Sequence, residues 1–117
     1  MDDIELSLAI PRCSWRELLL LVVRRRRVCR VDGSSMHPAL SDGDRVLYEP
    51  TSACVVGDVV LAQHPFVSGL KLIKRVEALD AEGRVTLRGD AGLASTDSRG
   101  FGSVASEAIL GRLTSRL

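Results

Sequence analysis

Short β-branched runs, separated by turns rich in glycine and aspartate, constrain the fold of this chain more than any other feature. Gly43 lies between two aspartates, Gly57 precedes Asp58, and Gly83 ends the turn that begins at Asp80. Because glycine reaches backbone angles that other residues avoid, such turns between β-branched runs predict antiparallel hairpins. The expected strands are Arg45–Glu49, Val59–Gln63, Leu70–Leu79, Arg84–Arg88 and Ala108–Leu113. We therefore expect a small, mainly β domain.

A single helix is expected ahead of these strands. Ser14 and Glu17 stand at the spacing of a capping box, which marks a helix start. The helix is predicted to run from about Trp15 to the arginine block Arg24–Arg27. The segment is apolar nearly all round, so we expect it to bury against another surface.

The length of 117 residues suits one domain with a single core. Within it we distinguish an N-terminal helical lead, residues 1–30, from a β domain, residues 31–117.

The block Arg24–Arg27 admits three interpretations. The arginines complement the negative end of the helix dipole at a solvated helix end, dock Leu18–Arg27 on an anionic membrane, or bind nucleic acid. The formal net charge of +1 favours the solvated end. Aromatic residues make up only 3% of the chain, too few for a base-stacking platform. We expect no nucleic-acid partner, and peripheral contact with an anionic membrane stays open.

The cysteines and the chain start indicate the compartment. Cys13, Cys29 and Cys54 form neither a CxxC pair nor a zinc pattern, so we expect half-buried thiols in a reducing compartment. The acidic start differs from the basic start of a secretory signal. The longest apolar run, Leu18–Val23, has six residues, against the roughly 20 that a spanning helix needs. We expect a cytoplasmic protein, at most peripheral to the inner face of the membrane, with no cofactor and no bound metal.

Lys74 is the candidate general base. In an extended Leu70–Val76 side chains alternate between faces, so Lys74 shares a face with Leu72 and Val76. Burial there would lower the lysine pKa, and a neutral lysine can accept a proton. The strand alone favours the alternative, a lysine whose stem packs inside while its amine reaches water.

Two loops carry candidate hydroxyl groups. Ser35 lies in the tight turn before Pro38, which restricts the backbone and can hold the serine outside regular structure. The loop Gly89–Gly102 is long for a compact domain, as functional loops often are. A serine and a lysine form a known pair of nucleophile and base. The residues themselves leave open whether Ser35 meets Lys74.

Taken in order, these segments resemble the boxes of the signal peptidase I family of Ser–Lys endopeptidases. Gly33–Leu40 resembles the nucleophile box, Ile73–Val76 the lysine box and Gly89–Gly102 the closing box, followed by a short link to Ile109–Arg112. The resemblance covers about residues 31–112 and implies a signal-peptidase-like antiparallel β domain that is catalytic.

The resemblance also implies roles for individual residues. Ser35 would be the nucleophile and Lys74 its general base. Ser95 matches the serine that orients the lysine amine, and Asp97 and Arg99 match a bracing ion pair.

The resemblance also implies that Met36 and Pro38 shape the substrate cleft. Gly33 stands where some bacterial members have a serine that helps to bind the oxyanion, so the Ser35 amide or another donor would take that part. Ala39 departs from the pattern, because a threonine is usual there.

Within the family, the short form of the chain and its lack of a spanning anchor, together with Gln63–Phe66 and Leu113–Arg116, resemble the maturation proteases of nickel-type superoxide dismutase. That branch trims an N-terminal propeptide and exposes the residues that bind nickel. The implied partner is a protein precursor.

Two other functions stay open. One is a compact leader peptidase, docked on the membrane by Leu18–Arg27, that cleaves export signals. The other is a non-catalytic, peptidase-like binding module, although the 30-residue lead is too short for a helix-turn-helix. A Ser–His mechanism would need His37 or His64, which we expect to be surface or structural residues.

Overall fold

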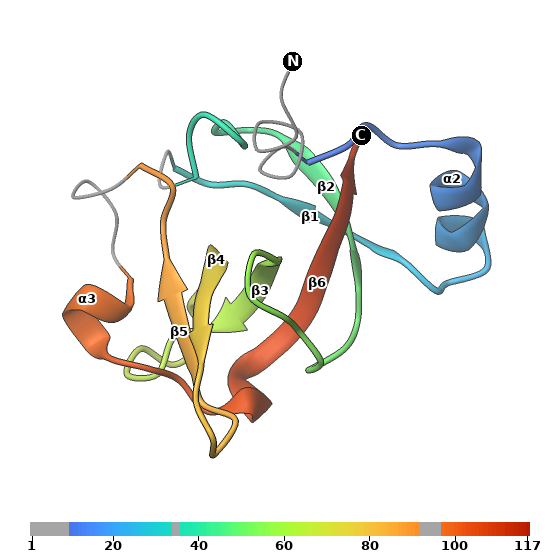
Figure 1. Cartoon of the computed structure of the whole chain (residues 1–117). Helices are drawn as coiled ribbons and strands as arrows, with labels where there is room; N and C mark the ends of the chain where they lie inside the picture. The colour runs from blue at the N-terminus through green and yellow to red at the C-terminus, as the bar shows by residue number, and fades with distance from the viewer. Residues whose placement is uncertain (1–9, 34–35, 92–96) are drawn as a thin grey trace.

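The computed structural model describes residues 10–33, 36–91 and 97–117, and its main feature is one six-stranded sheet (Figure 1). The strands are β1 (Arg27–Arg30), β2 (Arg45–Glu49), β3 (Val59–Gln63), β4 (Lys71–Leu79), β5 (Val85–Arg88) and β6 (Ile109–Arg116). The helices are α2 (Trp15–Val22), α3 (Ser98–Phe101) and the 3-10 turn η2 (Ser106–Ala108). The predicted fold class, mainly antiparallel β with an N-terminal helix, is confirmed.

The sheet has the strand order β1-β2-β6-β3-β4-β5, and all its pairings are antiparallel. Consecutive strands β3, β4 and β5 form the predicted hairpins, with Gly83 at a φ of 78° in the last turn. By contrast, β2 and β3 are not neighbours, because β6 runs between them (Figure 1). The last strand of the chain therefore holds the two halves of the sheet together.

Five strands agree with the sequence prediction to within a few residues, and β1 is the strand that it missed. β1 has only four residues, and none of them is buried. It lacks the alternating apolar pattern of an isolated strand, and its place comes from pairing with β2, as in Arg27 opposite Tyr48. Residues 27–30 of the lead thus belong to the sheet, and the division of the chain at residue 30 stays a prediction.

Two apolar clusters pack on the sheet, and β3 contributes to both through alternate side chains. Val59 and Leu61 point into the first cluster, and Val60 and Ala62 into the second. This explains why the continuous apolar run of β3 is buried along nearly its whole length. The second cluster also contains Val76, Val85, Leu87, Val104 and Ile109.

Helix α2 starts as predicted but ends earlier. The Ser14 hydroxyl accepts a hydrogen bond from the Glu17 amide at 3.3 Å, which caps the first turn. The helix ends at Val22, and Arg24 adopts a left-handed backbone with φ of 64°. The expectation of a helix reaching Arg24–Arg27 is wrong, because the chain reverses at Arg24 and enters β1.

The described chain does not supply the surface against which the apolar helix is expected to bury, since none of the eight residues of α2 is buried. Figure 1 shows α2 beside the sheet rather than beneath it. Within the described part of the chain, no helix has the length and apolar character needed to cross a membrane.

Candidate active site

Lys74 lies in the middle of β4, opposite Val60 of β3, and is only 3% exposed. Its face of the strand also carries Val76, which is 1% exposed within the second cluster. The predicted alternation is therefore confirmed: the ammonium-bearing side chain stands on an apolar stripe, while Ile73 packs against the first cluster on the other face.

Burial lowers the pKa of Lys74 below the ordinary lysine value, because the charged form loses its water shell. The negative charge of Asp97 acts in the opposite direction and the positive charge of Arg99 adds to the lowering. The net direction is downward. A lowered pKa increases the neutral fraction of the amine near pH 7, and only the neutral amine can take a proton.

Asp97 is a buried carboxylate, 1% exposed, on which four donors converge. The Arg99 guanidinium donates to it twice, at 3.0 and 2.8 Å. The backbone amides of Gly89 and Arg99 donate at 2.9 and 3.0 Å. Burial alone would raise the Asp97 pKa, but these donors hold it well below the usual aspartate range. The expected ion pair between Asp97 and Arg99 is present.

The same carboxylate ties two segments together. Asp97 caps the short helix α3 through the Arg99 amide and at the same time holds Gly89, the residue that follows β5. The adjacent Ser98 hydroxyl accepts from the Leu87 amide at 2.8 Å. The start of α3 is thereby fixed to the end of β5, close to β4 and Lys74.

A second ion pair, which sequence reasoning missed, braces the neighbouring residue. Arg75 donates to both oxygens of Asp90 at 2.9 Å and to the Gly57 carbonyl at 2.8 Å. Arg75 points to the face of β4 opposite Lys74, and the pair joins β4 to the segment after β5. The sequence offered one signal for it, the Gly-Asp dipeptide at residues 89 and 90.

Lys74 lines a cleft of about 630 Å³ between the end of β1 and the start of β4. Gly33 and Met36, the described residues on either side of positions 34 and 35, line the same cleft. Met36 is 1% exposed, whereas Pro38 is exposed and is not among the lining residues of the described chain. The remaining lining residues are Cys29, Arg30, Val31, Asp32, Leu61, Gly69, Leu70, Lys71, Leu72 and Ile73.

Two of the predicted site residues, Ser35 and Ser95, lie outside the described residues. Gly33 is described, with φ of 85°, a left-handed backbone that strains any side chain bearing a Cβ. Its amide donates to Asp42 at 2.7 Å. The local backbone therefore suits glycine at this position.

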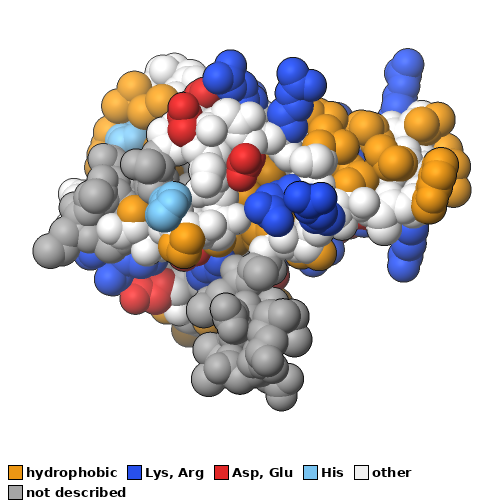
Figure 2. Space-filling view, turned by 90° about the horizontal axis from the view of Figure 1, so that it is seen from above, with side chains coloured by type: hydrophobic (Ala, Val, Ile, Leu, Met, Phe, Trp, Pro, Cys, Tyr) orange, Lys and Arg blue, Asp and Glu red, His pale blue; other side chains and the backbone are white. Residues whose placement is uncertain are grey.

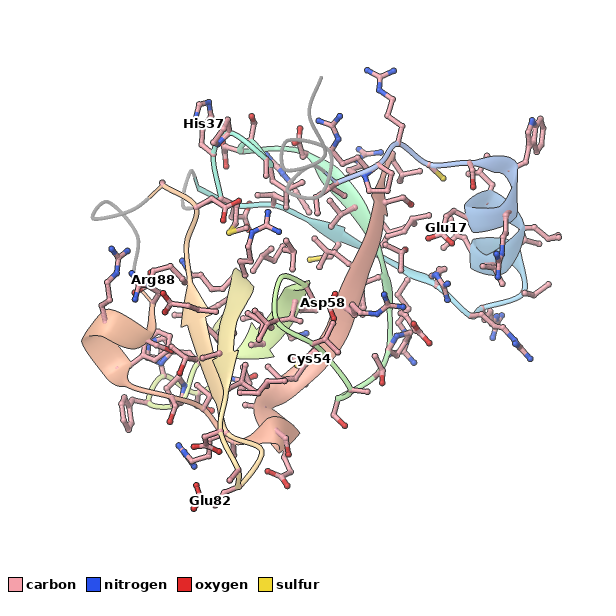
Figure 3. The ribbon with its side chains drawn as sticks, viewed as in Figure 1. Glu17, His37, Cys54, Asp58, Glu82 and Arg88 are labelled. Carbon is pink, nitrogen blue, oxygen red and sulfur yellow. The ribbon has the colours of Figure 1, made fainter. Side chains whose placement is uncertain are left out.

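Of the two histidines, His64 stabilises a turn and His37 is exposed to solvent. The His64 Nδ1 accepts from the amides of Phe66 and Val67, at 3.0 and 3.1 Å, and so stabilises the turn after β3. His37 is exposed on the loop after β1 (Figure 3). In the described ranges no three potential metal ligands form a group, and the three cysteines are half-buried free thiols.

Comparison with protein families supplies independent information about this arrangement. A family model described as signal peptidase, peptidase S26, matches residues 17–81, more than half of the chain. The match includes the cleft walls and Lys74, and it ends before the closing segment with Asp97. Among curated protein sequences none matches the chain.

Proposed function

The chain belongs to the signal peptidase family, peptidase S26, and we propose that it is a serine endopeptidase in which Ser35 is the nucleophile and Lys74 its general base. One observation carries the proposal. A buried lysine with a lowered pKa lines the same cleft as Gly33 and Met36, the nearest described neighbours of Ser35.

In the proposed mechanism the neutral Lys74 amine takes the hydroxyl proton as Ser35 Oγ attacks the peptide carbonyl. The lysine then passes this proton to the leaving amine, and the C–N bond breaks to give an ester on Ser35. Water, deprotonated by the same amine, hydrolyses the ester and restores the enzyme. The Ser35 amide is the proposed donor to the oxyanion, because Gly33 carries no hydroxyl and its amide is bonded to Asp42.

Three residues support the dyad in this proposal. Ser95 orients the Lys74 amine, a role taken from the family resemblance. Asp97 and Arg99 brace the closing segment, and their buried, four-donor arrangement supports that role. The negative charge of Asp97 also limits how far the pKa of Lys74 falls.

The substrate is proposed to be a cytoplasmic protein precursor with an N-terminal propeptide, with nickel-type superoxide dismutase as the specific candidate. The resemblance of Gln63–Phe66 and Leu113–Arg116 to that branch supports the candidate. Three free thiols fit a reducing compartment. Nickel would be the cargo of the substrate, and the peptidase itself needs no metal for Ser–Lys chemistry.

The test is the intact mass of the precursor after co-expression with the wild-type chain, with Ser35→Ala or with neither. Loss of the propeptide only with the wild-type chain is expected. Cleavage that persists with Ser35→Ala would remove Ser35 from the role of nucleophile. An unchanged precursor with the wild-type chain would reject this substrate.

One observation favours a second candidate, the compact leader peptidase that cleaves export signals at the membrane surface. Trp15, Leu19 and Val22 of α2 are all more than half exposed, and arginines follow them. Replacing the nickel precursor by an export precursor in the same mass assay separates the two. A non-catalytic binding module would cleave neither.

A further inference from the structure

Helix α2 turns its apolar side to solvent and its acidic side chain to the domain. Trp15, Leu18, Leu19 and Val22 fall on one side of the helix and are 88%, 38%, 62% and 77% exposed. The Glu17 side chain is only 13% exposed and lies on the side that faces the sheet (Figure 3). A surface helix usually has the opposite orientation. Its apolar side is therefore available for contact with a molecule or surface outside the described chain.

Polar contacts fix the helix in this orientation. The Glu17 carboxylate accepts from Arg26 Nε at 3.2 Å, and the Arg26 side chain is only 15% exposed. The hydroxyl of Ser115 in β6, a residue only 1% exposed, donates to Glu17 at 3.4 Å. Rotating the apolar side inward would break these contacts and expose two half-buried charges. The contacts also neutralise the acidic residue of the helix.

Arginines surround the exposed apolar side. Arg16 lies on the flank of α2, and Arg24, Arg25 and Arg27 follow in the reversal that leads into β1. All four are exposed, and none forms an ion pair with the residues described. Figure 2 shows the apolar side chains at this end of the molecule, with basic side chains projecting beside them. Among the described residues, this surface therefore combines exposed apolar area with positive charge only.

We propose that this surface, the α2 patch, is a docking site for the anionic surface of a lipid bilayer. The α2 patch consists of Trp15, Leu18, Leu19 and Val22 with Arg16, Arg24, Arg25 and Arg27. A short helix with tryptophan and leucine on one side and arginines at its margin lies in the plane of the interface, where the apolar side chains enter the headgroup boundary. The arginines meet the negative headgroups.

A second copy of the chain fits the α2 patch less well. In a two-fold symmetric dimer the same surface meets itself, so Arg16, Arg24 and Arg25 of one copy would approach those of the other. No acidic side chain of the patch offsets this repulsion, since Glu17 is bonded to Arg26. Charge complementarity therefore favours an anionic bilayer.

Docking would hold the cleft near the bilayer. Arg27 at the edge of the α2 patch precedes Val31 in the cleft wall by four residues, about 13 Å along a strand at roughly 3.3 Å per residue. That consequence, a cleft close to precursor segments at the membrane, rests on the proposed peptidase function. The lipid binding itself does not depend on catalysis.

The binding is measured by sedimentation of the purified full chain with vesicles of phosphatidylcholine alone or mixed with phosphatidylglycerol. Trp15 is the only tryptophan of the chain, so its emission reports directly on the α2 patch. We expect sedimentation with the mixed vesicles, a blue shift of Trp15 emission, and loss of both at high salt. Equal binding to neutral vesicles, or none to the mixed vesicles, would overturn the proposal.

Matched variants separate the α2 patch from general stickiness. Val22→Glu is expected to weaken binding at least tenfold, whereas Val55→Glu, at a similarly exposed valine outside the patch, leaves it unchanged. Arg25→Gln should weaken binding several-fold and Arg45→Gln should not. Circular dichroism checks that each variant is folded. Full binding by folded Val22→Glu would contradict the proposal.

Two further readouts separate the proposals from each other. Ser35→Ala should bind vesicles like the wild-type chain while cleaving no precursor. A wild-type chain that binds vesicles but cleaves no precursor would count against the peptidase alone. Cleavage without binding would count against the docking site alone. Light scattering would identify a second copy of the chain as the partner of the α2 patch if the wild-type chain were a dimer, Val22→Glu were a monomer and neither bound lipid. That result would overturn the bilayer proposal.

Discussion

Replacing Asp97 by asparagine should destabilise the protein far more than the same replacement at Asp32. Asp97 is 1% exposed and accepts four hydrogen bonds, two of them from the charged Arg99 side chain. Asparagine offers one acceptor oxygen, and its amide group must face a donor. Asp32 is 87% exposed and lies 3.9 Å from Arg30, so it is a control of the same chemistry without burial.

The expected loss at Asp97 is about 2 kcal/mol of unfolding free energy. Hydrogen bonds to a charged group contribute about 1.5–3 kcal/mol each, and removing a partner from a buried pair costs more. The Arg99 side chain is 29% exposed and regains water in the variant, which keeps the loss near the lower end. For a domain of this size about 2 kcal/mol corresponds to a Tm lower by about 8 °C. For Asp32→Asn we expect less than about 0.5 kcal/mol.

The pH dependence adds a second check. The folded-state pKa of Asp97 is lowered, so its stabilising contribution is present above the ordinary aspartate value of about 3.9 and is lost as the pH falls through the folded-state pKa. The difference in Tm between the wild-type chain and Asp97→Asn should therefore be largest above pH 5 and narrow in acid. Thermal unfolding followed by circular dichroism measures both quantities. Equal Tm losses for Asp97→Asn and Asp32→Asn at pH 7 would refute the reasoning.

Three further predictions concern the surroundings of the cleft. Lys74→Arg should be as inactive as Lys74→Ala, because a guanidinium keeps its proton, and cleavage of the precursor by the arginine variant would exclude Lys74 as the base. The negative charge of Asp97 raises the Lys74 pKa, so Asp97→Asn should lower that pKa further. In a plot of kcat/KM against pH, the rising limb should then lie at lower pH than in the wild-type chain. A limb that does not move would contradict this coupling. Arg75→Gln breaks the ion pair with Asp90 and should lower the Tm by several degrees. Arg88→Gln is the control, because its ion pair with Glu77 is about 40% exposed and its loss should change the Tm little. Equal changes in Tm would contradict the bracing role of Arg75.

Local sequence patterns predicted much of the sheet and the environment of the lysine. β2 and β3 have the expected bounds, since their runs are bounded by clear turns. The alternation of side chains along β4 correctly placed Lys74 with Val76 on an apolar face. Asp97 and Arg99 are two residues apart, so their ion pair could be anticipated from spacing.

Contacts between distant segments were beyond the reach of such patterns. The place of β6 between β2 and β3 depends on pairings such as Leu47 with Ser115. The orientation of α2 depends on Glu17, which bonds a hydroxyl 98 residues away in the chain. The apolar composition of α2 therefore predicted burial, whereas the polar contacts of Glu17 turn its apolar side outward.

The central claim, that Lys74 is the general base, is tested most directly by the titration of its amine. The chain has two lysines, Lys71 and Lys74, so ¹³Cε labelling of lysine gives two NMR signals, which Lys71→Arg assigns. We predict that the Lys74 signal titrates below the ordinary lysine value of about 10.4 and with the same midpoint as the rising limb of kcat/KM against pH. A Lys74 amine that titrates at or above the ordinary value, in a chain that cleaves its substrate at neutral pH, would contradict the account.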